Sequence, residues 1–356
     1  MKRVKRFWSL LFLGLIAVVA FTGCGTGKSN SPAKGEKKTE KNVVKIGYSS
    51  GSLCGAAIHL AEINGYYKEE FAKSDSDYEL VEIDAAQIAE LIGAKKVDAF
   101  CALSANMIQP MENGLDIAFT NGIHSGCTKY YVKGDSDIES VADLKGKKVG
   151  VPGLSDTSTI NLKRKLQSLD INPEDVEFVN YSMPDLATAL DNGAVDAVAM
   201  HDPVAYQSET SYGFKKIMDT GIDEKFKDEY CCIGLVTNTL IKEHPSAAAA
   251  YTRAVMKACA FIQAQPEEAA KLQIDHGYIS GDADTNASLL GSYDFSPSSS
   301  RVETDLRNAI TELQGTGDVK KDLDVDSFVA AHIAKLDDVP ESYTYDPDTK
   351  EFKEAK

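Results

Sequence analysis

The sequence predicts an α/β protein made of two similar lobes. Apolar runs of strand length alternate with amphipathic runs of helix length, which is typical of βαβ units and a largely parallel sheet. The chain has 356 residues, more than one small core holds, so two lobes are expected. A short repeat agrees. Gly93–Phe100 resembles Gly193–Val198, and in both a helix ends at Gly-Ala before a strand starts at Val-Asp-Ala.

The N-terminus predicts export and a lipid anchor. Residues 1–6 are basic, and Phe7–Phe21 is an apolar run too short for a stable membrane span. Gly23 then precedes Cys24, an arrangement that resembles a bacterial lipobox, so we expect a signal peptide over 1–23 and diacylglycerol on Cys24. Residues 24–42 read as a flexible, lipidated tether without large apolar residues. These features predict a protein held by lipid at the extracytoplasmic face of a cell membrane.

Composition and charge narrow the partners. The chain is 43% hydrophobic and 26% charged, which is typical of a soluble globular protein. Its formal net charge is −16, and the expected leader removes four basic residues and no acidic one. So acidic a chain repels phosphate, and nucleic acid is excluded as a partner. A monomer is expected.

The predicted first lobe comprises residues 43–127 together with 226–356. Its early strands and helices alternate, and a hinge is expected at Gly122–Cys127. The expected strands are Val43–Tyr48, Tyr78–Ile83, Val97–Leu103, one starting at Ile117–Phe119, and Cys231–Val236. The expected helices are Cys54–Ile63, Gln87–Ile92, one after Ser104–Asn106, Pro245–Gln263, Pro266–Ile274, Val302–Leu313 and Val325–Leu336.

The predicted second lobe comprises residues 128–225. Its expected strands are Thr128–Val132, Val149–Val151, Val176–Tyr181, Val195–Met200 and one ending at Asp219. Its expected helices are Val141–Leu144, one running to Leu169, Asp185–Leu190 and one starting at His201–Pro203.

The joint after the strand Val149–Val151 is the first candidate for a binding site. Pro152 and Gly153 end the strand, and five helix-capping residues follow from Ser155 to Thr159. A strand that ends in a polar loop before a helix presents free N–H groups and hydroxyls at one place. In an open α/β sheet that place lies outside the carboxyl ends of the strands, where ligands bind.

Several phrases resemble one family. They are Tyr48-Ser49, Gly65-Tyr66-Tyr67, the run S-V-A-D-L-K-G-K-K-V-G-V at Ser140–Val151, Gly193–Ala197 and Asp202-Pro203. Together they resemble the solute-binding proteins of nitrate, sulfonate and taurine ABC transporters over roughly Val43 to Leu290. The resemblance implies a bilobal periplasmic-binding-protein fold of type II, which closes by hinge motion on a ligand in the cleft, and an ABC permease as partner. The family often has Trp-Glu-Pro where this chain has His201-Asp202-Pro203.

The candidate ligand contacts are the polar residues of the loops expected to face the cleft. They are Ser49, Ser50, Cys54, Ser104, Asn106, Ser155, Thr157, Ser158, His201 and Asp202. Hydroxyls and helix-start amides suit a sulfonate-type anion, the ligand we expect. No arginine lies in these loops, which leaves a neutral or cationic ligand open, with Asp156 or Asp202 as its partner.

The cysteines and the absence of catalytic motifs define the alternatives. Six cysteines besides Cys24 have no zinc-site spacing, and we assign no metal ligands, no cofactor and no enzymatic activity. Disulfides stay open, as does binding of a soft metal or a sulfur-containing ligand by Cys54 and Cys127 with His124 and His201. Cys231-Cys232 faintly resembles the cysteine-rich motif of the thiamine-pyrimidine synthase of the same fold family, which keeps a thiamine-pyrimidine precursor open as the ligand.

Overall fold

The computed structural model describes residues 41–355. The expected signal peptide, the lipidation site Cys24 and the tether up to residue 40 lie outside the described residues. Within residues 41–355, no helix combines the length and apolar character that crossing a membrane requires.

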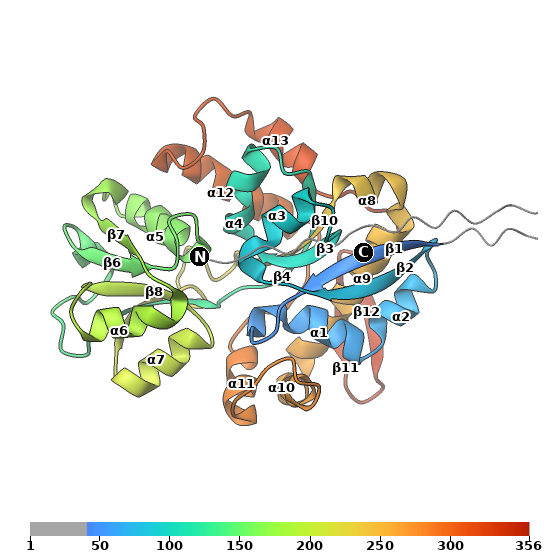
Figure 1. Ribbon diagram of the computed structural model, residues 1–356, viewed down its shortest axis with the longest axis horizontal. Helices are drawn as coiled ribbons and strands as arrows, with labels where there is room; N and C mark the ends of the chain where they lie inside the picture. The colour runs from blue at the N-terminus through green and yellow to red at the C-terminus, as the bar shows by residue number, and fades with distance from the viewer. Residues whose placement is uncertain (1–40, 356) are drawn as a thin grey trace, which may run out of the picture. The chain divides into compact units, whose positions relative to one another are not determined.

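The first sheet has five strands in the order β2-β1-β3-β10-β4 (Figure 1). β1 pairs in parallel with β2 and β3, whereas β10 pairs antiparallel with β3 and β4. The strands are β1 (Asn42–Tyr48), β2 (Ser76–Glu82), β3 (Ala99–Leu103), β4 (Ile117–His124) and β10 (Cys232–Thr237).

The second sheet has the order β7-β6-β8-β5-β9. β6 pairs in parallel with β7 and β8, whereas β5 pairs antiparallel with β8 and β9. The strands are β5 (Thr128–Val132), β6 (Lys148–Val151), β7 (Glu177–Asn180), β8 (Ala197–His201) and β9 (Lys215–Asp219). The two sheets therefore share one pattern.

The expectation of largely parallel sheets was wrong in part, because the chain crosses between the sheets twice. It leaves the first sheet at the end of β4 and returns at the start of β10, where Cys232 pairs with His124. A strand that enters where its neighbour leaves runs antiparallel to it. Of the predicted hinge segment, Gly122–His124 belong to β4, and Ser125–Cys127 connect β4 to β5.

The repeated Val-Asp-Ala phrase has one structural role in both sheets. The Asp98 carboxylate accepts a hydrogen bond from the Lys45 amide of β1 at 2.9 Å, and Asp98 N donates to Lys45 O. The Asp196 carboxylate accepts from the Lys148 amide of β6 at 2.8 Å, and Asp196 N donates to Lys148 O. Each aspartate therefore fastens the entry of one strand to the start of its parallel neighbour.

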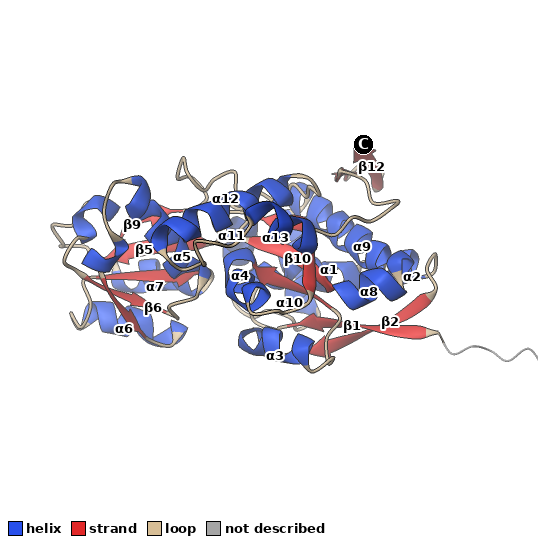
Figure 2. Ribbon diagram, turned by 90° about the horizontal axis from the view of Figure 1, so that it is seen from above, coloured by secondary structure: helices blue, strands red, loops and turns tan. Residues whose placement is uncertain are grey.

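Helix α9 (Pro245–Ala264) is the central helix of the first core. Most of its residues are buried, because alanines on every face allow close packing against α1, α2 and α8 (Figure 2). The Tyr251 hydroxyl donates to Phe100 O of β3 at 2.7 Å. The other helices of the early chain and of the return to the first sheet are α1 (Ala56–Ile63), α2 (Tyr66–Phe71), α3 (Ile88–Gly93), α4 (Ser104–Glu112) and α8 (Asn238–Glu243).

The second sheet is covered by fewer helices. They are α5 (Thr157–Ser168), α6 (Leu186–Asp191) and α7 (Val204–Tyr212). Short 3₁₀ turns occur in both halves, at Leu53–Gly55 (η1), Ala85–Gln87 (η2), Val141–Leu144 (η3), Pro173–Asp175 (η4) and Met183–Asp185 (η5). Asp156 caps α5, because its carboxylate accepts from Ser158 N at 2.9 Å.

The C-terminal part is partly as predicted. Its helices are α10 (Pro266–Asp275), α11 (Ala283–Gly291), α12 (Arg301–Thr316) and α13 (Val325–His332). α13 is shorter than expected, and a hairpin of β11 (Ser342–Asp346) and β12 (Glu351–Ala355) follows it. Tyr343 of this hairpin is buried with Met256 and Ala260 of α9.

Candidate functional site

A cleft of about 480 Å³ lies at the carboxyl ends of parallel strands from both sheets. The β1–η1 loop, the end of β3 and the start of α4 supply residues from one side. The β6–α5 joint, Met183 and the end of β8 supply residues from the other side. Strand ends of this kind are where open α/β sheets bind ligands.

The walls of the cleft are mainly apolar. Tyr48, Phe100, Met107 and Met183 line it together with aliphatic side chains. Tyr48 is held edge-on against His59 and Tyr278, with ring centroids 6.0 and 5.5 Å away. Such walls suit the faces of a flat ring more than a compact, fully hydrated ion.

A histidine–aspartate pair forms one polar part of the cleft. His201 Nε2 lies 2.8 Å from Asp156 Oδ1, and Thr128 Oγ1 lies 3.0 Å from His201 Nδ1. Burial disfavours the imidazolium, but the Asp156 carboxylate outweighs it and raises the pKa of His201 to about 10. His201 is therefore the positive partner of Asp156.

A second carboxylate that lines the cleft, Asp202, is paired with two side chains outside it. Lys129 donates to its Oδ2, and the Tyr293 hydroxyl donates to the same oxygen at 3.1 Å. Burial raises the pKa of Asp202, while the Lys129 ammonium opposes this shift. Among the described residues, neither a lysine nor an arginine lines the cleft itself.

Thiols form the base of the cleft. Cys54, Cys101 and Cys232 line it, and the six cysteines of the described chain are all free. Cys127 Sγ lies behind them, 2.9 Å from Cys231 Sγ. Hydrogen bonding from the Cys231 thiol lowers the pKa of the Cys127 thiol well below its ordinary value. One set of side chains here could hold a metal ion: Cys54, His124, Cys127 and Cys232.

Five of the ten predicted contact residues line the cleft. They are Ser49, Cys54, Asn106, His201 and Asp202. Of the other five, Ser50 and Ser104 donate their hydroxyl groups to protein acceptors outside the cleft. The exposed Ser50 hydroxyl donates to Glu82 at 2.8 Å, and the Ser104 hydroxyl donates to Tyr230 O at 3.1 Å.

The three predicted residues at the start of α5 bind protein groups. Thr157 donates through its amide and hydroxyl to Asn106 Oδ1 at 2.6 and 2.8 Å. Ser155 donates to Gln109 Oε1 at 2.9 Å, and Ser158 donates to Asp156. These bonds join the α5 start to α4 and satisfy the donors that the sequence suggested for a ligand.

Sequence reasoning missed the apolar lining of the cleft. Tyr48, Phe100, Met107 and Met183 line the cleft, but none was among the predicted contacts. The carboxyl-end rule that selected Ser49 applies equally to its neighbour Tyr48. Met183 follows β7 in the same way.

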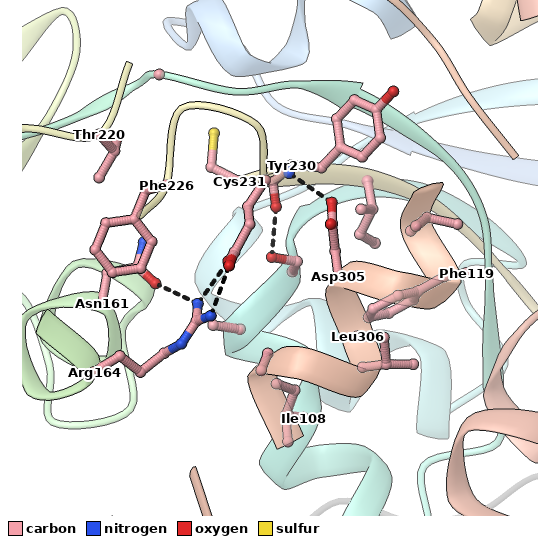
Figure 3. Close-up of a pocket in the computed structure, with 17 residues that line it drawn as sticks. Ile108, Phe119, Asn161, Arg164, Thr220, Phe226, Tyr230, Cys231, Asp305 and Leu306 are labelled. Carbon is pink, nitrogen blue, oxygen red and sulfur yellow. Dashed lines mark hydrogen bonds and ion pairs between the residues drawn. The ribbon is translucent and has the colours of Figure 1, made fainter. Parts of the chain in front are cut away.

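A smaller cavity of about 30 Å³ lies between α5 and α12 (Figure 3). That space holds roughly one water molecule. Its cation, Arg164, is neutralised by Glu229, with Nη1–Oε2 and Nη2–Oε1 distances of 2.9 and 3.0 Å, and its Nη1 lies 3.4 Å from Asn161 Oδ1. This cavity is an interior contact between helices rather than a ligand site.

A family model described as NMT1/THI5 like matches residues 55–269. The chain belongs to this family. The match begins at the end of η1, just after the β1–η1 loop, and includes α5, β8 and the strand β10 that carries Cys232. All the cleft-lining residues from Gly55 to Cys232 fall within the family match.

Relatives of known description fall in two groups. A Haemophilus influenzae protein assigned to thiamine biosynthesis is 34% identical over 147 residues, and a 4-amino-5-hydroxymethyl-2-methylpyrimidine phosphate synthase of Saccharomyces cerevisiae is 26% identical over 241. These alignments cover 40% and 61% of this chain, but only 44% and 66% of the two relatives, less than two thirds of either. A Bacillus subtilis protein assigned to aliphatic sulfonate binding is 24% identical over 269 residues, covering 74% of this chain and 77% of the relative.

Solved structures of periplasmic binding proteins have the same fold as this chain. The periplasmic aliphatic sulphonate binding protein of Escherichia coli superimposes with a TM-score of 0.69 at 19% identity, covering 83% of this chain and 92% of that chain. The periplasmic nitrate-binding protein of Synechocystis gives a TM-score of 0.64 at 13% identity, covering 82% and 86%. The predicted bilobal periplasmic-binding-protein fold is confirmed.

Proposed function

We propose that this protein is a lipid-anchored, extracytoplasmic solute-binding protein that delivers a small organic solute to an ABC importer. The cleft between the two sheets supports this proposal, because it is concave, mostly apolar and has a few convergent polar groups. The Gly23-Cys24 leader supports the anchor and the location. The partners are the solute, an ABC permease and the membrane, and the protein acts as a monomer.

The lining of the cleft favours a neutral or weakly basic nitrogen heterocycle of the aminopyrimidine class. Asp156 lines the cleft, and its Oδ2 accepts no hydrogen bond from residues 41–355. It offers an acceptor to a ring amino group, while Tyr48 and Phe100 provide apolar faces for the ring. The single observation that carries this choice is the open Oδ2 of the Asp156 carboxylate in a cleft that no lysine or arginine of the described chain lines and whose cationic His201 is already paired with Asp156 Oδ1.

A sulfonate-type anion is the second candidate. The Bacillus subtilis relative favours it, because that alignment covers 74% of this chain. The α5 start is the expected anion site, yet Asn106 already occupies the Thr157 amide and hydroxyl. An anion there also faces Asp156, so its binding requires these bonds to rearrange.

The test is isothermal titration of the purified protein with 4-amino-5-hydroxymethyl-2-methylpyrimidine, methanesulfonate and taurine in parallel. We expect binding of the pyrimidine with one site per chain. Asp156→Asn keeps a helix-capping side chain but removes the charge, and it should weaken pyrimidine binding about 10- to 100-fold, the loss of one charge-assisted hydrogen bond. Ser50→Ala is the control, because Ser50 lies in the same loop as Tyr48 but outside the cleft.

Two results would contradict the ligand choice or the function. Binding of sulfonates alone would transfer the ligand assignment to the α5 start. Mass spectrometry of the recovered pyrimidine tests the other point, because chemical conversion by the purified protein would indicate a synthase rather than a binding protein. Recovery of unchanged ligand is the expected result.

A further inference from the structure

Four metal-ligating side chains converge behind the cleft from separate segments. Cys54 lies in η1 after β1, His124 is the last residue of β4, Cys127 lies on the connection to β5, and Cys232 is the first residue of β10. One ligand atom from each lies within 4.8 Å of every other. Both crossings between the sheets therefore meet the η1 turn after β1 at this cluster.

The donor set matches a known type of coordination. Three cysteine sulfurs and one imidazole form the Cys₃His set of closed zinc sites, with Zn–S near 2.3 Å and Zn–N near 2.0–2.1 Å. Around a tetrahedral ion of that size, donor atoms lie roughly 3.4–3.8 Å apart. Donors that are already within 4.8 Å of one another need only small movements to reach that geometry. Sulfur-rich sets select thiophilic ions over Mg²⁺ and Ca²⁺.

His124 supplies an independent observation. Its side chain is fully buried and stacked on Tyr293, with ring centroids 5.0 Å apart. Its Nδ1 lies 3.2 Å from Ser125 O and 3.4 Å from Cys231 Sγ, while Nε2 has no hydrogen-bond partner among residues 41–355. With the proton on Nδ1, the ring donates to the Ser125 carbonyl and Nε2 keeps a free lone pair. Metal-bound histidines commonly have this second hydrogen bond to a carbonyl.

We propose that Cys54, His124, Cys127 and Cys232 bind one thiophilic transition-metal ion, with Zn²⁺ as the ion that this set favours. Cys54 and Cys232 reach the ion from the cleft wall, and His124 and Cys127 reach it from behind that wall. The ion cross-links the two crossover segments to the η1 turn after β1. This proposal does not depend on which solute the cleft binds.

Cys231 competes with the metal ion for the sulfur of Cys127. Its sulfur lies 2.9 Å from Cys127 Sγ, so oxidation of this pair to a disulfide would remove Cys127 from the site. The experiment therefore starts from the full chain, reduced with a phosphine and freed of metal with a chelator. Thiol titration of the same sample verifies that the six cysteines besides Cys24 are reduced.

The test is an anaerobic titration with Co²⁺, followed by displacement with Zn²⁺. We expect one equivalent of Co²⁺ per chain, with the strong visible bands of tetrahedral cobalt and thiolate-to-metal charge transfer in the near ultraviolet. Cys54→Ala changes the one half-buried ligand and should weaken Co²⁺ binding at least about 10-fold, since even loss of an outer partner of a ligand costs that much. His124→Gln should do the same.

Cys259→Ala is the matched control, because Cys259 is a buried cysteine of α9 outside the cluster. It should bind Co²⁺ as the wild type does, and Cys231→Ala should also retain the site. Less than stoichiometric cobalt in the reduced wild type would overturn the proposal, as would wild-type affinity in Cys54→Ala. If His124→Gln does not fold, Cys54→Ala against Cys259→Ala still decides the question.

Discussion

Arg164 is predicted to be one of the residues on which the stability of this fold depends most. Its guanidinium pairs in a fork with Glu229, and its Nε donates to Glu312 of α12 at 2.6 Å. The side chain is 3% exposed, compared with 19% for Glu229 and 32% for Glu312. Arg164 thus connects α5, beside the second sheet, to α12 and to the segment that returns to the first sheet.

Arg164→Ala should lower the free energy of unfolding by about 3 kcal/mol. Removing one partner of a buried ion pair typically costs about 3–5 kcal/mol, because the remaining charge is left buried. The partial exposure of both glutamates lets solvent offset part of that cost, which puts the effect at the lower end. Urea denaturation followed by circular dichroism measures it as a lower midpoint with an unchanged m-value.

An exposed ion pair provides the control. Lys145 and Asp175 are 68% and 39% exposed, so Lys145→Ala should cost less than about 1 kcal/mol. Adding Glu229→Gln to Arg164→Ala should restore part of the lost stability, because it removes the uncompensated carboxylate. A change below about 0.5 kcal/mol in Arg164→Ala would refute the reasoning, as would a double variant as unstable as the sum of the two single changes.

Two further predictions concern Asp305 of α12 and Gly122 of β4. Burial raises the pKa of Asp305 to about 6, although the Tyr230 amide donates to it. Because the pKa of an unfolded aspartate is near 4, this carboxyl should lower the free energy of unfolding as pH rises from about 4 to about 6. Asp305→Asn should remove that part of the pH dependence in denaturation curves measured over this range. Gly122→Ala would place a Cβ about 2.0 Å from the Tyr230 ring and should cost about 1–3 kcal/mol, whereas Gly93→Ala, which meets nothing within 4 Å, should leave the melting temperature unchanged or raised.

Local patterns were enough to predict much of the fold. The strand Thr128–Val132 and the short helix Val141–Leu144, a 3₁₀ helix in the structure, have the predicted bounds, because turn and capping residues bound short apolar runs there. The antiparallel direction of β10 was not predictable in the same way, since it depends on where the chain crosses between the sheets. The hairpin of β11 and β12 was missed because its burial depends on α9, about 80 residues earlier in the chain.

The candidate site shows a similar division. Ser49, His201 and Asp202, which were expected to face the cleft, line it in the structure, because parallel strands bring their carboxyl ends together. The residues at the start of α5 were predicted as contacts, but Asn106 from α4 occupies the donors of Thr157. A single sequence gives no signal for such a pairing between distant helices. The convergence of Cys232 with Cys54 likewise depends on the return crossing.

The most direct test of the proposed function is calorimetric titration of the wild-type protein with 4-amino-5-hydroxymethyl-2-methylpyrimidine, alongside methanesulfonate. The cleft, with the Asp156 carboxylate and without a lysine or arginine among its described lining residues, predicts saturable binding of the pyrimidine at one site and weak or absent binding of the sulfonate. Saturable binding of methanesulfonate with no heat from the pyrimidine would contradict the ligand assignment. Binding of neither, together with no binding of any other small solute, would contradict a role in solute capture.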